Sequence, residues 1–230
     1  MSHGVNESSL NLTDIEFLSP TPNSILLKQT ADLHSPSIYT PKLDAFNASL
    51  YLVTNGTLAS APMISVPVPA LHVRHPDTNI TIETNATFIS ADQIAAFSTE
   101  GFNVTNAKVN LTAPAGQPNL NAFAYIPNPS VLTVEMGNVT MQLSTQLGVV
   151  GNSTINNMIL KPGNNSLPLT GILDQLLVTK SLNATGWVTM SIVGQSAIYN
   201  GEHLPFYEKA LASNTLTLDM NVLQILDDST

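Results

Sequence analysis

The sequence contains no cysteine and few charged side chains. The absence of cysteine excludes disulfides, thiolate catalysis and zinc held by cysteine. Asp, Glu, Lys and Arg make up 10% of the 230 residues, against about 25% in ordinary globular chains. Seven basic residues against sixteen acidic ones give a net charge of −9, and Arg74 is the only arginine. We therefore expect no nucleic-acid partner and no attraction to anionic lipid surfaces.

Segments that would direct the chain to a membrane are also missing from the sequence as given. It has no run of about 18 apolar residues, which a membrane-spanning helix requires. The start, Met1-Ser2-His3-Gly4, lacks the basic and apolar segments of a secretory signal peptide. Taken alone, these two absences give no indication of a secretory route.

The acceptor triplet for N-linked glycans, Asn-x-Ser/Thr, indicates such a route. The twelve acceptors are Asn6, Asn11, Asn47, Asn55, Asn79, Asn85, Asn103, Asn110, Asn138, Asn152, Asn164 and Asn183. Chance predicts about 4.5 triplets from 23 Asn and 45 Ser plus Thr. The excess predicts a glycosylated protein of the secretory pathway; alternatively, Asn- and Thr-rich strands produce the triplets without modification. We expect a truncated protein that is normally tethered to a membrane through a segment absent from this chain.

Apolar and polar side chains alternate with the period of half-buried strands. The clearest runs are Phe46 to Leu52, Asn79 to Phe88, Val188 to Ile192 and Leu216 to Val222. Three predicted acceptors, Asn47, Asn79 and Asn85, fall on the polar face of these runs, where a glycan would be solvated. The pattern predicts an all-β fold.

One strand changes phase, and a few segments favour short helices. Apolar positions are even-numbered from Leu132 to Met136 and odd-numbered from Val139 to Leu143. Gly137 lies at the change, which predicts a β-bulge there. Short helices are predicted at Ser90–Phe97, Ile172–Thr179 and Pro205–Ala212.

The two halves of the chain resemble each other at a spacing of 92 to 93 residues. The matched segments are 12–15 with 104–107, 35–37 with 128–130, and 46–50 with 139–143. This period fits an immunoglobulin-sized β-sandwich. We therefore predict two tandem immunoglobulin- or fibronectin-III-like β-sandwiches with a few short helices, at residues 8–100 and 101–226. The alternative is one large sandwich in which the similarity arose by chance.

Three stretches carry a family resemblance: Ile126 to Met141, Val150 to Ile155, and Leu160 to Asn165. They resemble the fungal domain of unknown function of membrane-anchored vacuole-membrane proteins, which include an autophagy-linked transmembrane family. The Asn-Pro-Ser turn is also similar to late-embryogenesis-abundant type 2 domains of the water-stress and hypersensitive-response class. The matching motif residues are Asn128, Pro129, Ser130, Gly137, Asn138, Pro162 and Gly163. Physically they suit turns and a bulge.

The resemblance implies tandem sandwiches on the luminal side of the vacuole membrane; the cell surface or an extracellular location is the alternative. It supplies no catalytic residues, so the expected function is a non-enzymatic structural or protein-binding module. The expected partner is an unknown protein or the rest of the same chain, with no cofactor. Three other functions stay open. The Met-rich strands could bind a lipid or another apolar ligand, the protein could hydrolyse cell-wall glycans, or it could protect against desiccation.

Candidate reactive residues are few and scattered. His72 and His75 are three apart, so on a strand they would face opposite sides, and we expect no metal site. Calcium at Asp92 and Glu100 is a weak alternative. Arg74 could hold a carboxylate, but a solvated side chain is the simpler interpretation.

Trp187, the only tryptophan, is expected to pack in or near the core, with a sugar-stacking platform as the alternative. Four carboxylates, Asp14, Glu16, Glu135 and Asp219, are expected to face solvent rather than pair for glycoside hydrolysis.

Overall fold

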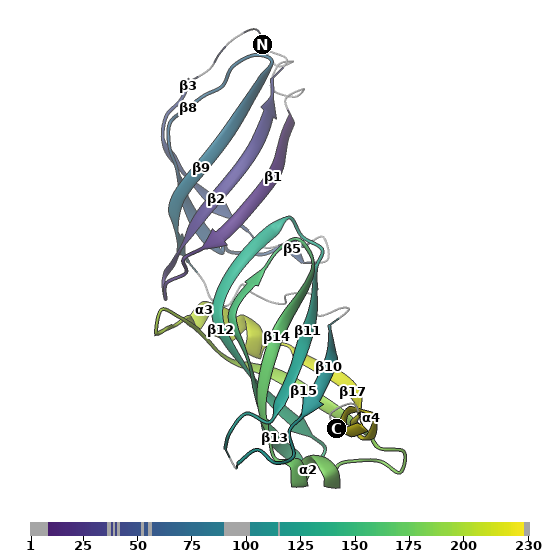
Figure 1. Cartoon of the computed structure of the whole chain (residues 1–230). Helices are drawn as coiled ribbons and strands as arrows, with labels where there is room; N and C mark the ends of the chain where they lie inside the picture. Colours follow the sequence, from purple (N-terminus) through teal and green to yellow (C-terminus); the bar gives the residue numbers. More distant parts are fainter. Residues whose placement is uncertain are drawn as a thin grey trace.

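The computed structural model describes residues 9–35, 38, 40, 42–51, 53–54, 57–89, 102–114 and 116–227. The protein is mostly β, with 63% strand and 10% helix, as the alternating pattern predicted. Thirteen strands join in one large mixed sheet, and two short strand pairs stand apart from it. Figure 1 shows the N-terminal strands at one end of the molecule and the C-terminal strands at the other.

Five longer strands form the N-terminal half of the sheet. In spatial order they are β1 (Ser9–Leu18), β2 (Ser24–His34), β9 (Asp77–Phe88), β7 (Ile64–Val68) and β4 (Phe46–Leu50). All neighbours within this half are antiparallel. The separate pairs are β3 (Lys42–Leu43) with β8 (Leu71–His72), and β5 (Val53–Thr54) with β6 (Thr57–Leu58).

The C-terminal half begins with five antiparallel strands and then adds further elements. The five, in spatial order, are β10 (Asn103–Val109), β11 (Leu120–Asn128), β14 (Gly163–Leu173), β13 (Gly148–Leu160) and β12 (Leu132–Thr145). The additions are β15 (Trp187–Tyr199), β16 (Glu202–His203), β17 (Thr215–Asn221), α2 (Gln175–Lys180), α3 (Pro205–Ala212) and α4 (Val222–Asp227). Strand β15 pairs with β12, β16 and β17.

Both halves have the same strand order. Counted along the chain, β1, β2, β4, β7 and β9 in one half and β10 to β14 in the other lie side by side as first, second, fifth, fourth and third. Two of the three segment pairs matched by sequence fall on corresponding strands: 12–15 on β1 with 104–107 on β10, and 46–50 on β4 with 139–143 on β12. In the third pair, 35–37 with 128–130, residues 36 and 37 lie outside the described residues. The proposed boundary at residues 100 and 101 lies outside the described residues.

The two halves are joined in one sheet rather than separated. Strand β1 pairs in parallel with the start of β12, where Ile15 lies opposite Leu132 and Phe17 opposite Val134. On the same edge of β12, residues Asn138 to Ser144 pair with β15. Because both strands pair with β12, this long strand belongs to both parts of the sheet.

Further contacts hold this junction together. The Ser19 amide donates a hydrogen bond to the Glu135 carboxylate at 2.7 Å. The ring of Phe88, at the end of β9, stacks on Phe206 of α3 with centroids 3.6 Å apart. Tyr207 meets the edge of the same Phe88 ring. Burial, and secondly the Glu135 charge, raises the pKa of the Tyr207 hydroxyl well above its usual range, so this group stays protonated.

The register of β12 shifts at Gly137, where the phase change predicted a bulge. Gly137 has a φ of +71°, and a Cβ atom there would overlap the carbonyl oxygen of Ile198 on β15. The glycine lies between the part of β12 that pairs with β1 and the part that pairs with β15. It therefore allows the strand to change partners.

Burial follows the predicted alternation where a strand is covered by neighbours. Ile82 and Ala86 on β9 are buried, as are Val188, Met190 and Ile192 on β15. On β4, however, Phe46 is 48% exposed, because among the described residues this strand pairs on one side only, with β7. Strand β17 is half-buried on its apolar face and ends at Asn221, so Val222 begins α4 rather than extending the strand.

The predicted helices have different outcomes. Helix α3 spans Pro205–Ala212, as predicted. The helix predicted from Ile172 begins only at Gln175, because β14 continues to Leu173. The Asp174 side chain caps the helix by accepting a hydrogen bond from the Leu177 amide. The helix predicted at Ser90–Phe97 lies outside the described residues. Within the described part of the chain, no helix has the length and apolar character needed to cross a membrane.

Candidate functional site

The predicted glycan acceptors lie on the surface of both halves. All ten that the structure describes are exposed: Asn11, Asn47, Asn79, Asn85, Asn103, Asn110, Asn138, Asn152, Asn164 and Asn183. Asn6 and Asn55 lie outside the described residues. An attached glycan must be solvated, so each described position satisfies the steric requirement for the modification.

Asparagines that are not acceptors are more varied in burial. Asn119 and Asn165 are only 7% and 8% exposed, and neither begins an acceptor triplet, because the second residue after each is Asn121 and Leu167 respectively. Asn119 donates from Nδ2 to the Leu173 carbonyl and accepts the Leu173 amide at Oδ1, both at 2.8 Å. Asn119 is thus buried and bonded to the backbone through both of its amide atoms, whereas the described acceptor asparagines are exposed.

Two acceptors are held in the same local geometry. The Asn183 Oδ1 atom accepts hydrogen bonds from the amide and hydroxyl of Thr185, at 2.9 and 2.8 Å. The Asn110 Oδ1 atom accepts the same pair from Thr112, at 3.0 and 2.8 Å. Asn183 accepts a third bond, from the Trp187 amide at 3.0 Å. These bonds engage the oxygen, whereas a glycan would be attached to the other amide atom, Nδ2.

The Asn-Pro-Ser motif forms a turn that is closed by its own side chains. Asn128 Oδ1 accepts from the Ser130 amide at 3.1 Å and from its hydroxyl at 2.6 Å. The Asn128 Nδ2 group donates to the Leu132 carbonyl at 2.7 Å. Pro129, exposed between them, fits a turn that links β11 to β12. These contacts give Asn128 and Ser130 a structural role.

The second motif, around Pro162 and Gly163, forms the turn between β13 and β14. Gly163 has a φ of +88°. The nearby Asn165, which was not among the predicted motif residues, fixes this turn. Its Oδ1 accepts a hydrogen bond from the Lys161 amide. Its Nδ2 donates to the Lys161 carbonyl at 2.8 Å and to the Ile126 carbonyl at 3.2 Å. The sequence signals for Asn165 were its place at the end of a resembling stretch and the glycine two residues before it. The last motif residue, Asn138, accepts the Asn157 amide at 2.9 Å and so supports the bulged strand.

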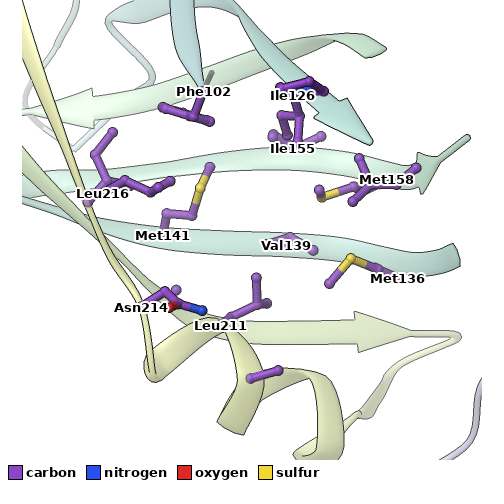
Figure 2. A pocket seen from close by; sticks show the side chains of 15 residues that line it. Phe102, Ile126, Met136, Val139, Met141, Ile155, Met158, Leu211, Asn214 and Leu216 are labelled. Atoms are coloured by element: carbon purple, nitrogen blue, oxygen red, sulfur yellow. The ribbon is translucent and has the colours of Figure 1, made fainter. Parts of the chain in front are cut away.

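A small apolar cavity lies in the C-terminal half (Figure 2). Strands β11, β12, β13, β15 and β17, helix α3 and Phe102 surround it. Asn214 provides the single polar side chain of its lining: Phe102, Ile126, Pro127, Met136, Val139, Met141, Ile155, Met158, Leu160, Ile192, Gly194, Ala210, Leu211, Asn214 and Leu216. Such a surface can contact hydrocarbon but offers little to orient a polar ligand.

The cavity includes three of the five methionines that suggested an apolar ligand. Met136, Met141 and Met158 line it, whereas Met190 and Met220 do not. Its volume is about 90 Å³. Pockets for drug-sized ligands have about 300–1,000 Å³. The cavity as it stands therefore accommodates only a short hydrocarbon segment.

Two histidines among the described residues each contact one carboxylate. His34 contacts Asp77 at 2.7 Å and His203 contacts Glu208 at 2.5 Å. His72, His75 and Arg74 are exposed. Within the described residues no group of three His, Asp or Glu side chains could hold a metal ion. Asp92 and Glu100, the weak calcium candidates, lie outside those residues.

The candidate carboxylates make structural contacts. Glu16 pairs with Lys28 at 3.1 Å, and this contact raises the pKa of Lys28. Glu135 is half-buried rather than solvent-facing, because it accepts the Ser19 amide at the junction. Asp219 accepts the Thr189 hydroxyl at 2.5 Å on the outer face of the sheet. The exposed Asp14 lies on β1, so these four residues do not assemble into one cleft.

Trp187 is not a core residue. It is the first residue of β15, and 44% of its surface is exposed. It lines a cleft with Gln146, Ser181, Asn183, Val188, Thr189 and Asp219. Of the expected core or half-buried packing role, the core position is therefore wrong: the strand begins at Trp187 with its side chain on the polar face, while Val188 faces the core.

Comparison with known proteins gives one partial match. Residues 79–143 match the family model described as "Protein of unknown function (DUF3712)". The match begins in β9 of the N-terminal half and ends in β12, and it includes the Asn-Pro-Ser turn and Gly137. No curated protein matches the chain, and no solved structure matches it.

Proposed function

We propose that this chain is a non-enzymatic, N-glycosylated β module on the luminal or extracellular side of a membrane, with a structural or protein-binding role. The exposure of all ten described acceptor asparagines is the observation that carries the proposal. If the triplets were a by-product of composition, some would be expected at positions as buried as Asn119 and Asn165. N-linked glycans occur on secreted proteins and on the exposed surfaces of membrane proteins, and the proposed luminal or extracellular location follows from this.

The architecture that we propose is a duplicated sandwich. The shared strand order of the two halves supports two tandem copies of an immunoglobulin- or fibronectin-III-like unit. In this proposal the second copy gained β15, β17 and α3, and β12 became the strand that both copies share. Curved antiparallel sheets that carry solvated outer faces suit display of glycans.

The proposed setting is a fungal membrane protein, tethered through a segment outside this chain, at the vacuole membrane or the cell surface. It is supported by the resemblance in the Asn-Pro-Ser and Gly137 region, which the family match also includes. The neutral polar surface, with 10% charged residues, suits display in a lumen better than binding to nucleic acid. Its partner would be a protein or another part of its own chain.

The test is production of the chain behind a secretion signal in a glycosylating eukaryotic host. Native protein is then treated with peptide-N-glycosidase in ¹⁸O water, which removes N-glycans and marks each occupied asparagine as labelled aspartate. We expect a mass loss of several glycans and labels at several of the ten exposed acceptors. A matched batch made without the secretion signal should show neither. An unchanged mass in the secreted batch would overturn the proposal.

The Met-lined cavity favours a second candidate function, binding of an apolar ligand. Its walls are almost entirely apolar, and methionine side chains adapt to irregular partners. The occupant would be a hydrocarbon segment short enough for about 90 Å³. Native mass spectrometry of the secreted protein tests this candidate: an added mass that Met141→Phe removes would support it. An unliganded mass throughout would reject it.

A further inference from the structure

The turn before β15 places an exposed tryptophan next to a glycan acceptor. Asn183 and Trp187 are linked at both ends of the turn: the Asn183 amide donates to the Trp187 carbonyl at 2.9 Å, and the Trp187 amide donates to Asn183 Oδ1 at 3.0 Å. The Gly186 amide donates to the Asn183 carbonyl at 3.1 Å. These bonds fix the acceptor and the start of the strand with respect to each other.

Both side chains line one open cleft. The cleft has a volume of about 430 Å³, within the range of about 300–1,000 Å³ of ligand clefts. Its wall combines the 44% exposed indole of Trp187 with the polar side chains of Gln146 and Asp219. An aromatic face beside hydrogen-bonding groups matches the two kinds of surface that a pyranose presents, a C–H face and a rim of hydroxyl and amide groups.

We propose that the first N-acetylglucosamine of a glycan on Asn183 packs against Trp187 in this cleft. The inference rests on the proposed function, because it requires that the chain be glycosylated. The sugar's C–H face covers the indole, and its acetamido and hydroxyl groups lie near Gln146 and Asp219. The glycan thereby shields an apolar surface that water otherwise contacts, and it holds the loop that leads into β15.

Asn110 provides a natural comparison within the same chain. Its Oδ1 accepts the same two bonds from Thr112, so the local geometry of the acceptor is alike. Four residues further on, however, the position of Trp187 is taken by Pro114. A glycan on Asn110 therefore has no aromatic partner at this spacing, and its removal should leave Trp187 unaffected.

The experiment uses the fluorescence of Trp187, which is the only tryptophan and so reports on this cleft alone. Acrylamide quenching is measured on the secreted, glycosylated protein in three forms: untreated, trimmed by an endoglycosidase to a single N-acetylglucosamine per site, and fully deglycosylated. We expect the quenching constant to be unchanged by trimming and to rise at least about twofold on full removal.

Three variants separate the Asn183 glycan from the rest. Thr185→Ala abolishes this acceptor and should give the high quenching of the fully deglycosylated protein. Thr185→Ser keeps the acceptor and the hydroxyl, and Thr112→Ala abolishes only the Asn110 acceptor, so both should behave like the untreated protein. If Thr185→Ala does not fold, the three glycoforms of the unaltered protein still decide the question.

The outcomes distinguish the two proposals. Equal quenching in all three glycoforms, with ¹⁸O labelling showing that Asn183 is occupied, would overturn the packing of sugar on Trp187 and leave the proposed function standing. Glycans at other acceptors but none on Asn183 would overturn it as well. Absence of glycans at every acceptor would overturn both.

Discussion

The two halves of the sheet share a strand order but differ in what covers their third strand. In the N-terminal half this strand is β4, which lies at the edge, and Leu50 on it is half-buried. In the C-terminal half it is β12, which β13 and β15 flank, and the corresponding Leu143 is only 4% exposed. The apolar alternation of the two strands is the same. A repeat therefore specifies which face is apolar, whereas the elements added after it determine how deeply that face is buried.

The strongest test of this comparison replaces the corresponding leucines. Leu143→Ala should lower the free energy of unfolding by about 3–4 kcal/mol, because it leaves a cavity between covered strands. Leu50→Ala should cost about 1 kcal/mol or less, because the side chain is partly solvated already. Urea denaturation of the two variants from the same host measures both. Equal losses would show that the halves are packed alike and that β15 does not make the difference.

A second test concerns the glycine at which β12 changes partners. Gly137→Ala should cost about 3 kcal/mol, because it combines a positive φ with overlap of the Ile198 carbonyl. Gly163→Ala is the matched control: its φ is also positive, but nothing lies within 4 Å of the added Cβ. We expect the control to cost about 1 kcal/mol. A Gly137→Ala variant as stable as the control would contradict the role given to the bulge.

A third test addresses the turn between β13 and β14 in the C-terminal half. Asn165→Ala should cost about 2 kcal/mol, since it leaves the Lys161 amide and buried carbonyl groups without their partner. The neighbouring Asn164 is exposed, so Asn164→Ala should change stability by less than about 0.5 kcal/mol. Both are compared after deglycosylation, because Asn164 is a predicted acceptor. Similar effects of the two substitutions would remove the structural role of Asn165.

The smallest effect is expected where the halves meet. Phe88→Ala removes the ring that stacks on Phe206 and should cost about 1–2 kcal/mol. It should also broaden calorimetric unfolding, or split it into two transitions, as the halves lose coupling. Phe123→Ala serves as the control, because this ring is 41% exposed on β11. A single sharp transition in Phe88→Ala would show that the pairing of β1 with β12 couples the halves without this ring.

Sequence reasoning succeeded where a property depends on neighbours along the chain. The phase change at Gly137, the helix at Pro205–Ala212 and the exposed register of Asn79 and Asn85 are all local patterns. It failed where a property depends on contacts with residues that are distant in the sequence. Nothing in the local pattern indicated that Asn165 would bond to Ile126, or that Glu135 would accept an amide from the other half.

By itself, then, the sequence determined the strands, their apolar faces, the repeat and the acceptor asparagines, because period-two patterns and triplets are written in consecutive residues. Only the tertiary structure decided that β1 pairs with β12, that Trp187 lies beside Asn183 in an open cleft and that the methionines leave a cavity of about 90 Å³. Strand pairing between distant segments uses backbone hydrogen bonds, which every residue type except proline can donate, so the local side-chain pattern of one strand does not identify its partner.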